Sequence, residues 1–326
     1  VDKYSGILRA SCACAGNDHR LGANEAPPAI MSIYFGDYLN GIFDEIEGIG
    51  SSVSEKIMAD INLGVKNLPK VAKDTSDRNR TSPVAFTGNK FEFRAVGSSH
   101  NIAEAATIFN LMVAYGYDEI YSRLEKMEGK KKENALIVIK DILKETKRVR
   151  FEGDNYSDEW HKEAETRGLP NAKNTPAALE LMLAKEAEEL FSRYEVLSPK
   201  QVESKVEIKL EAYINVKDIE YKTAINMANT LVLPAIARQI SVVGGAAGAA
   251  KSGGVDSKAL SSAVKELDGL YEGILNAITD LETSLASCEE IEDLHKQAHA
   301  YAEDGAEKLE ALRVLVDKAE TLVSAD

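Results

Sequence analysis

Residues 16–28 read Gly-Asn-Asp-His-Arg-Leu-Gly-Ala-Asn-Glu-Ala-Pro-Pro, and this stretch is the most informative part of the chain. It follows a helical pattern over residues 3–14 and precedes an apolar stretch over residues 29–34, which we expect to form a short buried strand. The stretch holds one arginine, Arg20, and one glutamate, Glu25, and two prolines end it. A loop of this composition is typical of a mobile lid over charged substrates.

Two further charged motifs follow the lid motif along the chain. Residues 77–83 read Asp-Arg-Asn-Arg-Thr-Ser-Pro, which predicts a turn that carries two arginines. Residues 90–94 read Lys-Phe-Glu-Phe-Arg, where aromatic and charged side chains alternate as they do along a strand. Glu92 and Arg94 therefore share one face of the sheet. Because burying unpaired charges is costly, we expect that face to be solvated or lined with partners.

From residue 100 onward the pattern is helical. Amphipathic segments cover residues 103–115, 117–127 and 134–147; Ser157 is predicted to cap a helix, Thr175-Pro176 to open another, and residues 201–240 to form a long helix bent at Pro234. The glycines between residues 244 and 254 predict a flexible connection. They do not predict a phosphate loop, because no strand precedes them.

The C-terminal segment, residues 255–326, is predicted to be an acidic helical hairpin with a turn near residues 288–290. Its first helix carries apolar residues alternately four and three apart, and its second helix repeats the spacing. The first stripe is Leu260, Val264, Leu267, Tyr271, Ile274, Ile278, Leu281 and Leu285; the second is Leu309, Leu312, Val316, Ala319 and Val323. A packing arm is the favoured interpretation over a cofactor-binding bundle.

Composition excludes several classes of function. The net charge of −14 disfavours nucleic acid and anionic membranes as partners. No apolar run reaches the roughly 18–20 residues that span a bilayer. Three cysteines in 326 residues favour reduced thiols and a cytoplasmic location. The chain starts Val-Asp-Lys-Tyr, with neither a signal-peptide pattern nor an initiator Met, so we expect it to be cut from a longer protein.

The lid motif, the Arg-Asn-Arg turn and the Lys-Phe-Glu-Phe-Arg strand, in that order, resemble the second half of a glutamine synthetase catalytic domain. The Asn-Glu-Ala-Pro-Pro form of the lid, the long insertion over residues 36–76 and the helical C-terminal extension resemble the large type III members. The resemblance implies an α+β, predominantly helical fold with few antiparallel strands. Residues 1–245 would form the partial catalytic domain, with strands over residues 84–96, and residues 255–326 the long-helix extension.

The resemblance also implies the role of each site residue. Such a ligase phosphorylates glutamate with ATP and then joins the acyl phosphate to ammonia, so its site holds phosphates, a divalent metal and a carboxylate. The implied roles are: Glu25 and Arg20, catalytic; Arg20 and Arg94, substrate binding; Arg78, Arg80 and Lys90, binding of ATP phosphates; Glu92, metal ligand. Lys90 stands where arginine is usual in the family, which weakens its assignment.

The chain departs from the family pattern upstream of these motifs. It lacks the Glu-x-Glu strand, the metal-binding histidine and the paired upstream glutamates, so the resemblance implies that this segment alone is inactive. The implied cofactors are ATP and Mg²⁺ or Mn²⁺, the implied partners are glutamate and ammonia, and the implied assembly is a ring-shaped homo-oligomer, a dodecamer in the family. Two alternatives stay open: a related carboxylate–amine ligase that uses another amine, and a non-catalytic helical scaffold or regulatory protein.

Overall fold

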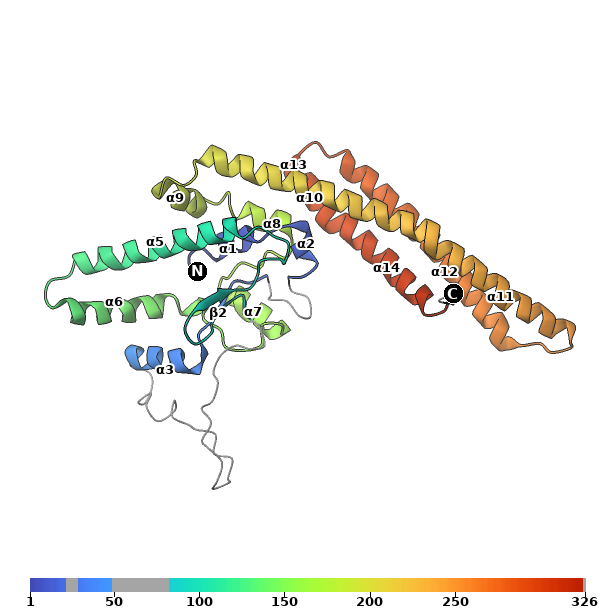
Figure 1. Ribbon diagram of the computed structural model, residues 1–326, viewed down its shortest axis with the longest axis horizontal. Coiled ribbons are helices and arrows are strands. Elements are labelled where there is room, and N and C mark those ends of the chain that lie inside the picture. The colour runs from blue at the N-terminus through green and yellow to red at the C-terminus, as the bar shows by residue number, and fades with distance from the viewer. Residues whose placement is uncertain (22–28, 49–81, 325–326) are drawn as a thin grey trace, which may run out of the picture. The chain divides into compact units, whose positions relative to one another are not determined.

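The computed structural model describes residues 1–21, 29–48 and 82–324 (Figure 1). Two compact units divide the chain, Val1–Val206 and Glu207–Asp326. Helices dominate both units and a three-stranded sheet lies in the first, which confirms the predicted α+β, mainly helical fold class. The predicted domain limits, 1–245 and 255–326, stay predictions.

The sheet has the strand order β1 (Ile33–Tyr34), β2 (Val84–Phe86) and β3 (Phe91–Phe93). Strands β2 and β3 form the predicted antiparallel pair, with Ala85 opposite Glu92. Strands β1 and β2 are parallel, so the prediction of antiparallel strands was wrong for this pair. The difference follows from the connections, because a short turn joins β2 to β3 whereas the long segment from residue 35 to residue 83 permits a parallel crossover.

The helices of the first unit cover most of the predicted segments. Their bounds are α1 (Ser5–Ser11), α2 (Ala15–Asp18), α3 (Gly36–Glu47), α5 (Ala103–Glu125), α6 (Lys131–Glu145), the 3₁₀ turn η1 (Lys147–Val149), α7 (Asp158–Thr166), α8 (Thr175–Glu180) and α9 (Lys185–Arg193). Ser157 caps α7 as predicted, because its Oγ accepts a hydrogen bond from the backbone N–H of Trp160. The segments predicted over 103–115 and 117–127 are one helix, since Gly116 costs a helix only about 1 kcal/mol.

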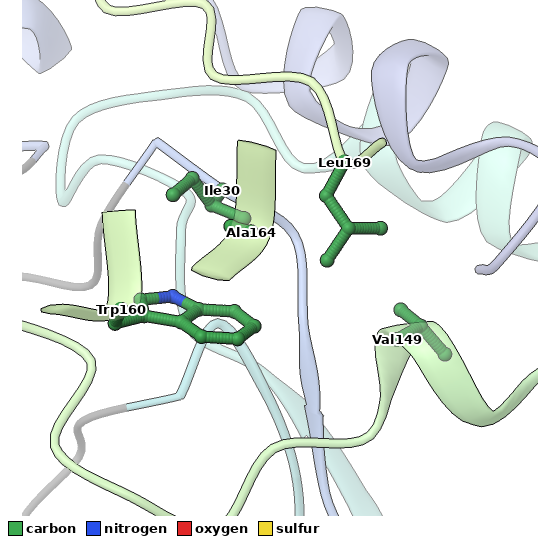
Figure 2. Close-up of a cluster of buried hydrophobic side chains, with 5 residues drawn as sticks. All are labelled: Ile30, Val149, Trp160, Ala164 and Leu169. Carbon is green, nitrogen blue, oxygen red and sulfur yellow. The ribbon is translucent and has the colours of Figure 1, made fainter. Parts of the chain in front are cut away.

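The single tryptophan belongs to a cluster of buried side chains against which Ile33 of β1 packs (Figure 2). Its members are Ile30, Val149, Trp160, Ala164 and Leu169. The ring of Phe151 stacks on Trp160 with centroids 3.7 Å apart. Phe151 itself is tied to β1, since its N–H donates to the carbonyl of Ile33 over 3.1 Å. Residues 149–151 therefore join α7 to the edge of β1, and the isolated bridge between Ile33 and Arg150 continues the sheet there.

The second unit is built from long helices. They are α10 (Pro199–Met227), which begins in the first unit, the π segment η2 (Ala228–Val232), α11 (Leu233–Ser252), α12 (Lys258–Glu289), α13 (Leu294–Ala300), the π segment η3 (Tyr301–Gly305) and α14 (Ala306–Glu320). Helix α12 packs against both α11 and α14. The first predicted stripe is buried from Leu267 through Leu285, apart from half-buried Tyr271, and of the second stripe Leu312 and Ala319 are buried.

Two local predictions for these helices need correction. Gly244, Gly245 and Gly248 lie inside α11 and not in a flexible connection, and the turn begins only at Gly253. The irregularity predicted at Pro234 is a π segment just before it, because the proline ring lacks the N–H that a regular helix bonds to residue 230. Among the described helices one, Pro199–Ser252, is by length and composition apolar enough to span a membrane, and one such helix is weak evidence of a membrane protein.

Candidate active site

The structure describes only part of the predicted site. Arg20, Lys90, Glu92 and Arg94 lie in the described ranges, whereas Glu25, Arg78 and Arg80 lie outside them. The roles assigned to all of these residues stay predictions. The described residues nevertheless show which contacts hold residues 17–21 of the lid motif and the charged residues 90–94 in place.

Strand β3 presents the predicted charged face. The Glu92 carboxylate accepts from Lys90 Nζ at 3.1 Å and from Arg94 Nε at 3.2 Å. These two hydrogen bonds, first that of Lys90 and then that of Arg94, hold the pKa of Glu92 below its ordinary value. The side chain of Glu92 is more than a third exposed and that of Arg94 is 12% exposed. Solvent therefore reaches the glutamate but is largely excluded from the arginine. The prediction that Glu92 and Arg94 share one face is confirmed.

Arg20 and Arg94 meet although 74 positions separate them. Arg20 follows α2, and its Nη2 donates to the backbone carbonyl of Arg94 over 2.8 Å. Its Nη1 donates to Asn17 Oδ1 over 3.3 Å. The Arg20 guanidinium is therefore held against the backbone of Arg94, and guanidinium groups suit carboxylate or phosphate oxygens.

A buried polar network below Arg20 was not predicted. Asn17 is 1% exposed and links the end of α1 to the segment after β3. Asp18 accepts from the N–H of Thr175 at 2.8 Å and from its Oγ1 at 2.7 Å, which binds the N-terminus of α8 to α2. Arg9 is 1% exposed, lies 3.7 Å from Asp18 and donates to the carbonyl of Ala172.

One signal in the sequence points to this network. Arg9 interrupts an otherwise small and apolar helical pattern, and a charge on a buried helix face needs a partner elsewhere in the fold. The partner, Asp18, lies in the lid motif itself. Nothing in the sequence indicates the link from Asp18 to Thr175 or from Asn17 to Ala95, because both join distant segments.

The described residues do not complete a metal site. Mg²⁺ and Mn²⁺ prefer oxygen ligands, and the carboxylate of Glu92 is such a ligand. No group of three or more histidine, cysteine, aspartate or glutamate side chains gathers within residues 1–21, 29–48 and 82–324 to hold an ion. A metal at Glu92 would therefore need further ligands from outside these ranges.

The comparison with known proteins agrees with the site motifs. Residues 135–251 match the family model of the glutamine synthetase C-terminal domain. The chain is 44% identical over 237 residues to the type-3 glutamine synthetase of Dictyostelium discoideum, an alignment that covers 72% of this chain and 32% of that protein. It is 33% identical over 331 residues to the glutamine synthetase of Bacteroides fragilis, which covers 98% of this chain and 45% of that protein.

A third relative, the glutamine synthetase of Butyrivibrio fibrisolvens, is 39% identical over 236 residues and is covered to 32% of its length. The chain therefore belongs to the glutamine synthetase family. Within that family it is similar to the type-3 enzymes, which confirms the resemblance drawn from its motifs. The chain spans 32–45% of the length of these relatives.

Proposed function

We propose that this chain forms part of an ATP-dependent ligase that makes glutamine from glutamate and ammonia through a γ-glutamyl phosphate. The observation that carries the proposal is the hydrogen bond from the Arg20 guanidinium to the backbone carbonyl of Arg94, which joins two separate charged motifs next to the ion pair of Arg94 with Glu92. The relatives named glutamine synthetase support the reaction.

The arginines suit the anionic groups of such a reaction. Arg94 is nearly closed off from solvent and its Nε is held by Glu92, so the guanidinium is oriented before substrate arrives. In the proposal Arg94 binds the substrate carboxylate, and Arg20 contacts both the substrate and the transferred phosphoryl group. Lys90 is exposed beside them and would meet phosphate oxygens as a point charge.

The residues outside the described ranges complete the proposed mechanism. Glu25 would take a proton from ammonium and shield the acyl phosphate from water. Arg78 and Arg80 would hold the phosphates of ATP. Glu92 would serve as one ligand of Mg²⁺ or Mn²⁺, and the metal supplies neutralisation of the polyphosphate charge.

The sequence and the family resemblance also imply a location and an assembly for the protein. We infer a cytoplasmic homo-oligomer with its sites in a ring assembly, a dodecamer as the family resemblance implies, with neither nucleic acid nor membrane as partner. The upstream motifs are absent from this chain, so the chain by itself is expected to be inactive.

The test measures glutamine formation and ADP release by the full gene product that contains this chain, supplied with glutamate, ammonia and MgATP. Arg94→Ala is expected to lower kcat/KM about 100-fold or more, as the loss of one preorganised donor does. Arg123→Ala is the matched control and should retain activity, because within the described part of the chain Arg123 donates to Glu119 and Glu145, which lie outside the predicted site.

Each alternative has its own outcome in this assay. ADP release that depends on glutamate but requires an amine other than ammonia would identify a related carboxylate–amine ligase. The absence of both nucleotide binding and product from the full protein would reject the enzyme and favour the helical scaffold.

A further inference from the structure

The side chain of Asn17 lies where three segments of the site meet. Its Nδ2 donates to the carbonyl of Cys12, at the end of α1, over 2.7 Å and to the carbonyl of Ala95, after β3, over 2.8 Å. Its Oδ1 accepts from Arg20. The residue is 1% exposed, so water does not replace these partners.

Only an amide satisfies this arrangement. The carbonyls of Cys12 and Ala95 accept hydrogen bonds and cannot donate, so the NH₂ group must face them and the oxygen must face Arg20. An aspartate of the same shape would lack both donors and place a charge against two carbonyl oxygens. An alanine would remove the hydrogen bonds to the carbonyls of Cys12 and Ala95 and the hydrogen bond from Arg20.

These contacts also affect how Arg20 is held against the backbone of Arg94. Arg20 Nη2 donates to the carbonyl of Arg94, one residue before the carbonyl that Asn17 binds. The amide of Asn17 and the guanidinium of Arg20 thus hold adjacent backbone groups of the segment that follows β3. Removal of the Asn17 amide would therefore release both the Arg20 side chain and the backbone next to the carbonyl that Arg20 binds.

We propose that Asn17 is a positioning residue that sets the spacing between Arg20 and Arg94, and hence the grip of the site on an acidic amino-acid substrate. This inference rests on the proposed function. Asn17 does not touch the reacting atoms, and its effect reaches the substrate through the two guanidinium groups.

Asn155 provides a matched control. It is also fully buried, with 0% exposure, and its amide also links two segments, since Nδ2 donates to Ser82 Oγ and Oδ1 accepts from Ser32 Oγ. Its amide bonds to neither Arg20 nor Arg94. Asn155→Ala and Asn17→Ala therefore remove comparable buried amides, and only one of them supports the arginines.

The first measurement is steady-state kinetics of the full gene product at a temperature where the variants are folded by tryptophan fluorescence. Asn17→Ala is expected to raise KM for glutamate roughly tenfold or more with KM for ATP within about twofold, because misplacing a binding group by an ångström has effects of this size. Asn155→Ala should leave KM for glutamate unchanged. Equal changes in the two variants would overturn the proposal and leave Asn17 a purely structural residue.

A second pair and a second measurement keep the test decisive. If Asn17→Ala does not fold, Asn17→Asp and Asn155→Asp, which keep the shape of the side chains, are compared in the same way. If the parent protein makes no glutamine, the proposed function fails, and labelling of arginines with phenylglyoxal, read by mass spectrometry, still tests the positioning. Faster labelling of Arg20 in the Asn17 variant alone supports the inference, and equal labelling in parent and variants rejects it.

Discussion

Glu47 is the last residue of α3, and its buried carboxylate binds the segment that follows α6. Its oxygens accept from Arg150 Nη2 at 2.7 Å and from Lys147 Nζ at 3.4 Å, and its side chain is 1% exposed. Burial alone would raise the pKa of Glu47, but the hydrogen bonds from Arg150 and Lys147 outweigh it, so the pKa lies below its ordinary value. The ionised carboxylate therefore stabilises the fold at neutral pH.

Glu47→Gln is expected to lower the free energy of unfolding by about 3 kcal/mol at pH 7, because it removes one partner of a buried ion pair. Since the folded pKa lies below the unfolded value, the stabilising effect is complete above the unfolded pKa of about 4.3 and is lost as the pH falls through the folded pKa. The difference between variant and parent should therefore shrink in acid. Urea unfolding followed by tryptophan fluorescence at several pH values measures it.

The control for this prediction is an exposed ion pair. Glu133 lies 3.2 Å from Lys130 and both side chains are exposed. Glu133→Gln should change the free energy of unfolding by less than about 1 kcal/mol at any pH. A loss in Glu47→Gln that does not depend on pH would contradict the assignment of its effect to the carboxylate charge.

At the scale of residues, some contacts can be predicted from the sequence and others cannot. Alternation along residues 90–94 places Glu92 and Arg94 on one face, because a strand fixes the direction of neighbouring side chains. The meeting of Arg20 with Arg94 is local to neither motif, and no spacing rule predicts it. The resemblance to a family implies that the two arginines share a site, and the structure shows that Asn17 holds both the Arg20 side chain and the carbonyl of Ala95, the residue after Arg94.

At the scale of elements, two glycines of the second unit differ in how closely other side chains approach them. A Cβ atom built on Gly245, inside α11, would meet nothing within 4 Å, whereas one built on Gly305, at the end of η3, would lie 2.6 Å from the ring of Tyr221. Tyr221 is fully buried there, and its hydroxyl donates to the carbonyl of Tyr301 over 2.7 Å. Gly305 is thus required by packing, and Gly245 is not required by contacts within the described part of the chain.

Gly245→Ala is expected to raise the free energy of unfolding by about 0.5–1 kcal/mol, because alanine is the better helix former and the added methyl group meets open space. Gly305→Ala is expected to lower it by about 1–3 kcal/mol, because Tyr221 must shift to admit the methyl group. Thermal unfolding followed by circular dichroism at 222 nm compares the two. Changes of the same sign would show that the two helical positions are not distinguished by packing.

The same glycines explain where the prediction of elements was wrong. Clustered glycines ordinarily mark a loop, but α11 continues through them while packing along α12, so tertiary contacts outweigh weak propensity. The apolar stripe of α12 was predictable because its period is long and regular. The π segments were not, since a widened turn depends on local packing more than on composition.

At the scale of the whole molecule, the fold class follows from the sequence because long periodic segments determine it. The division of the chain does not, since the units separate within the uninterrupted helix α10 and no change of composition marks the place. The uneven charge was visible in the sequence: residues 256–326 hold 17 acidic and 6 basic residues. This makes the second unit the acidic part of the chain.

The long reach of the first unit's hydrogen bonds has a consequence for how fast the protein folds. Arg9 and Ala172 are 163 positions apart, Asp18 and Thr175 are 157 apart, and Ser32 and Asn155 are 123 apart. Hydrogen bonds between distant residues of the second unit close shorter loops, such as the 80 positions from Tyr221 to Tyr301. Because closing long loops costs entropy before any contact forms, the bundle should form first on dilution from denaturant.

Stopped-flow refolding tests this order, because the only tryptophan, Trp160, is buried in the first unit. Part of the helical circular dichroism signal should return in a phase faster than the burial of Trp160 seen by fluorescence. Coincident phases would instead mean that the two units cross a single barrier. The amide of Asn17 and the carboxylate of Asp18 then belong to the late contacts, so the contact between Arg20 and the backbone of Arg94 is among the last features of the first unit to take shape.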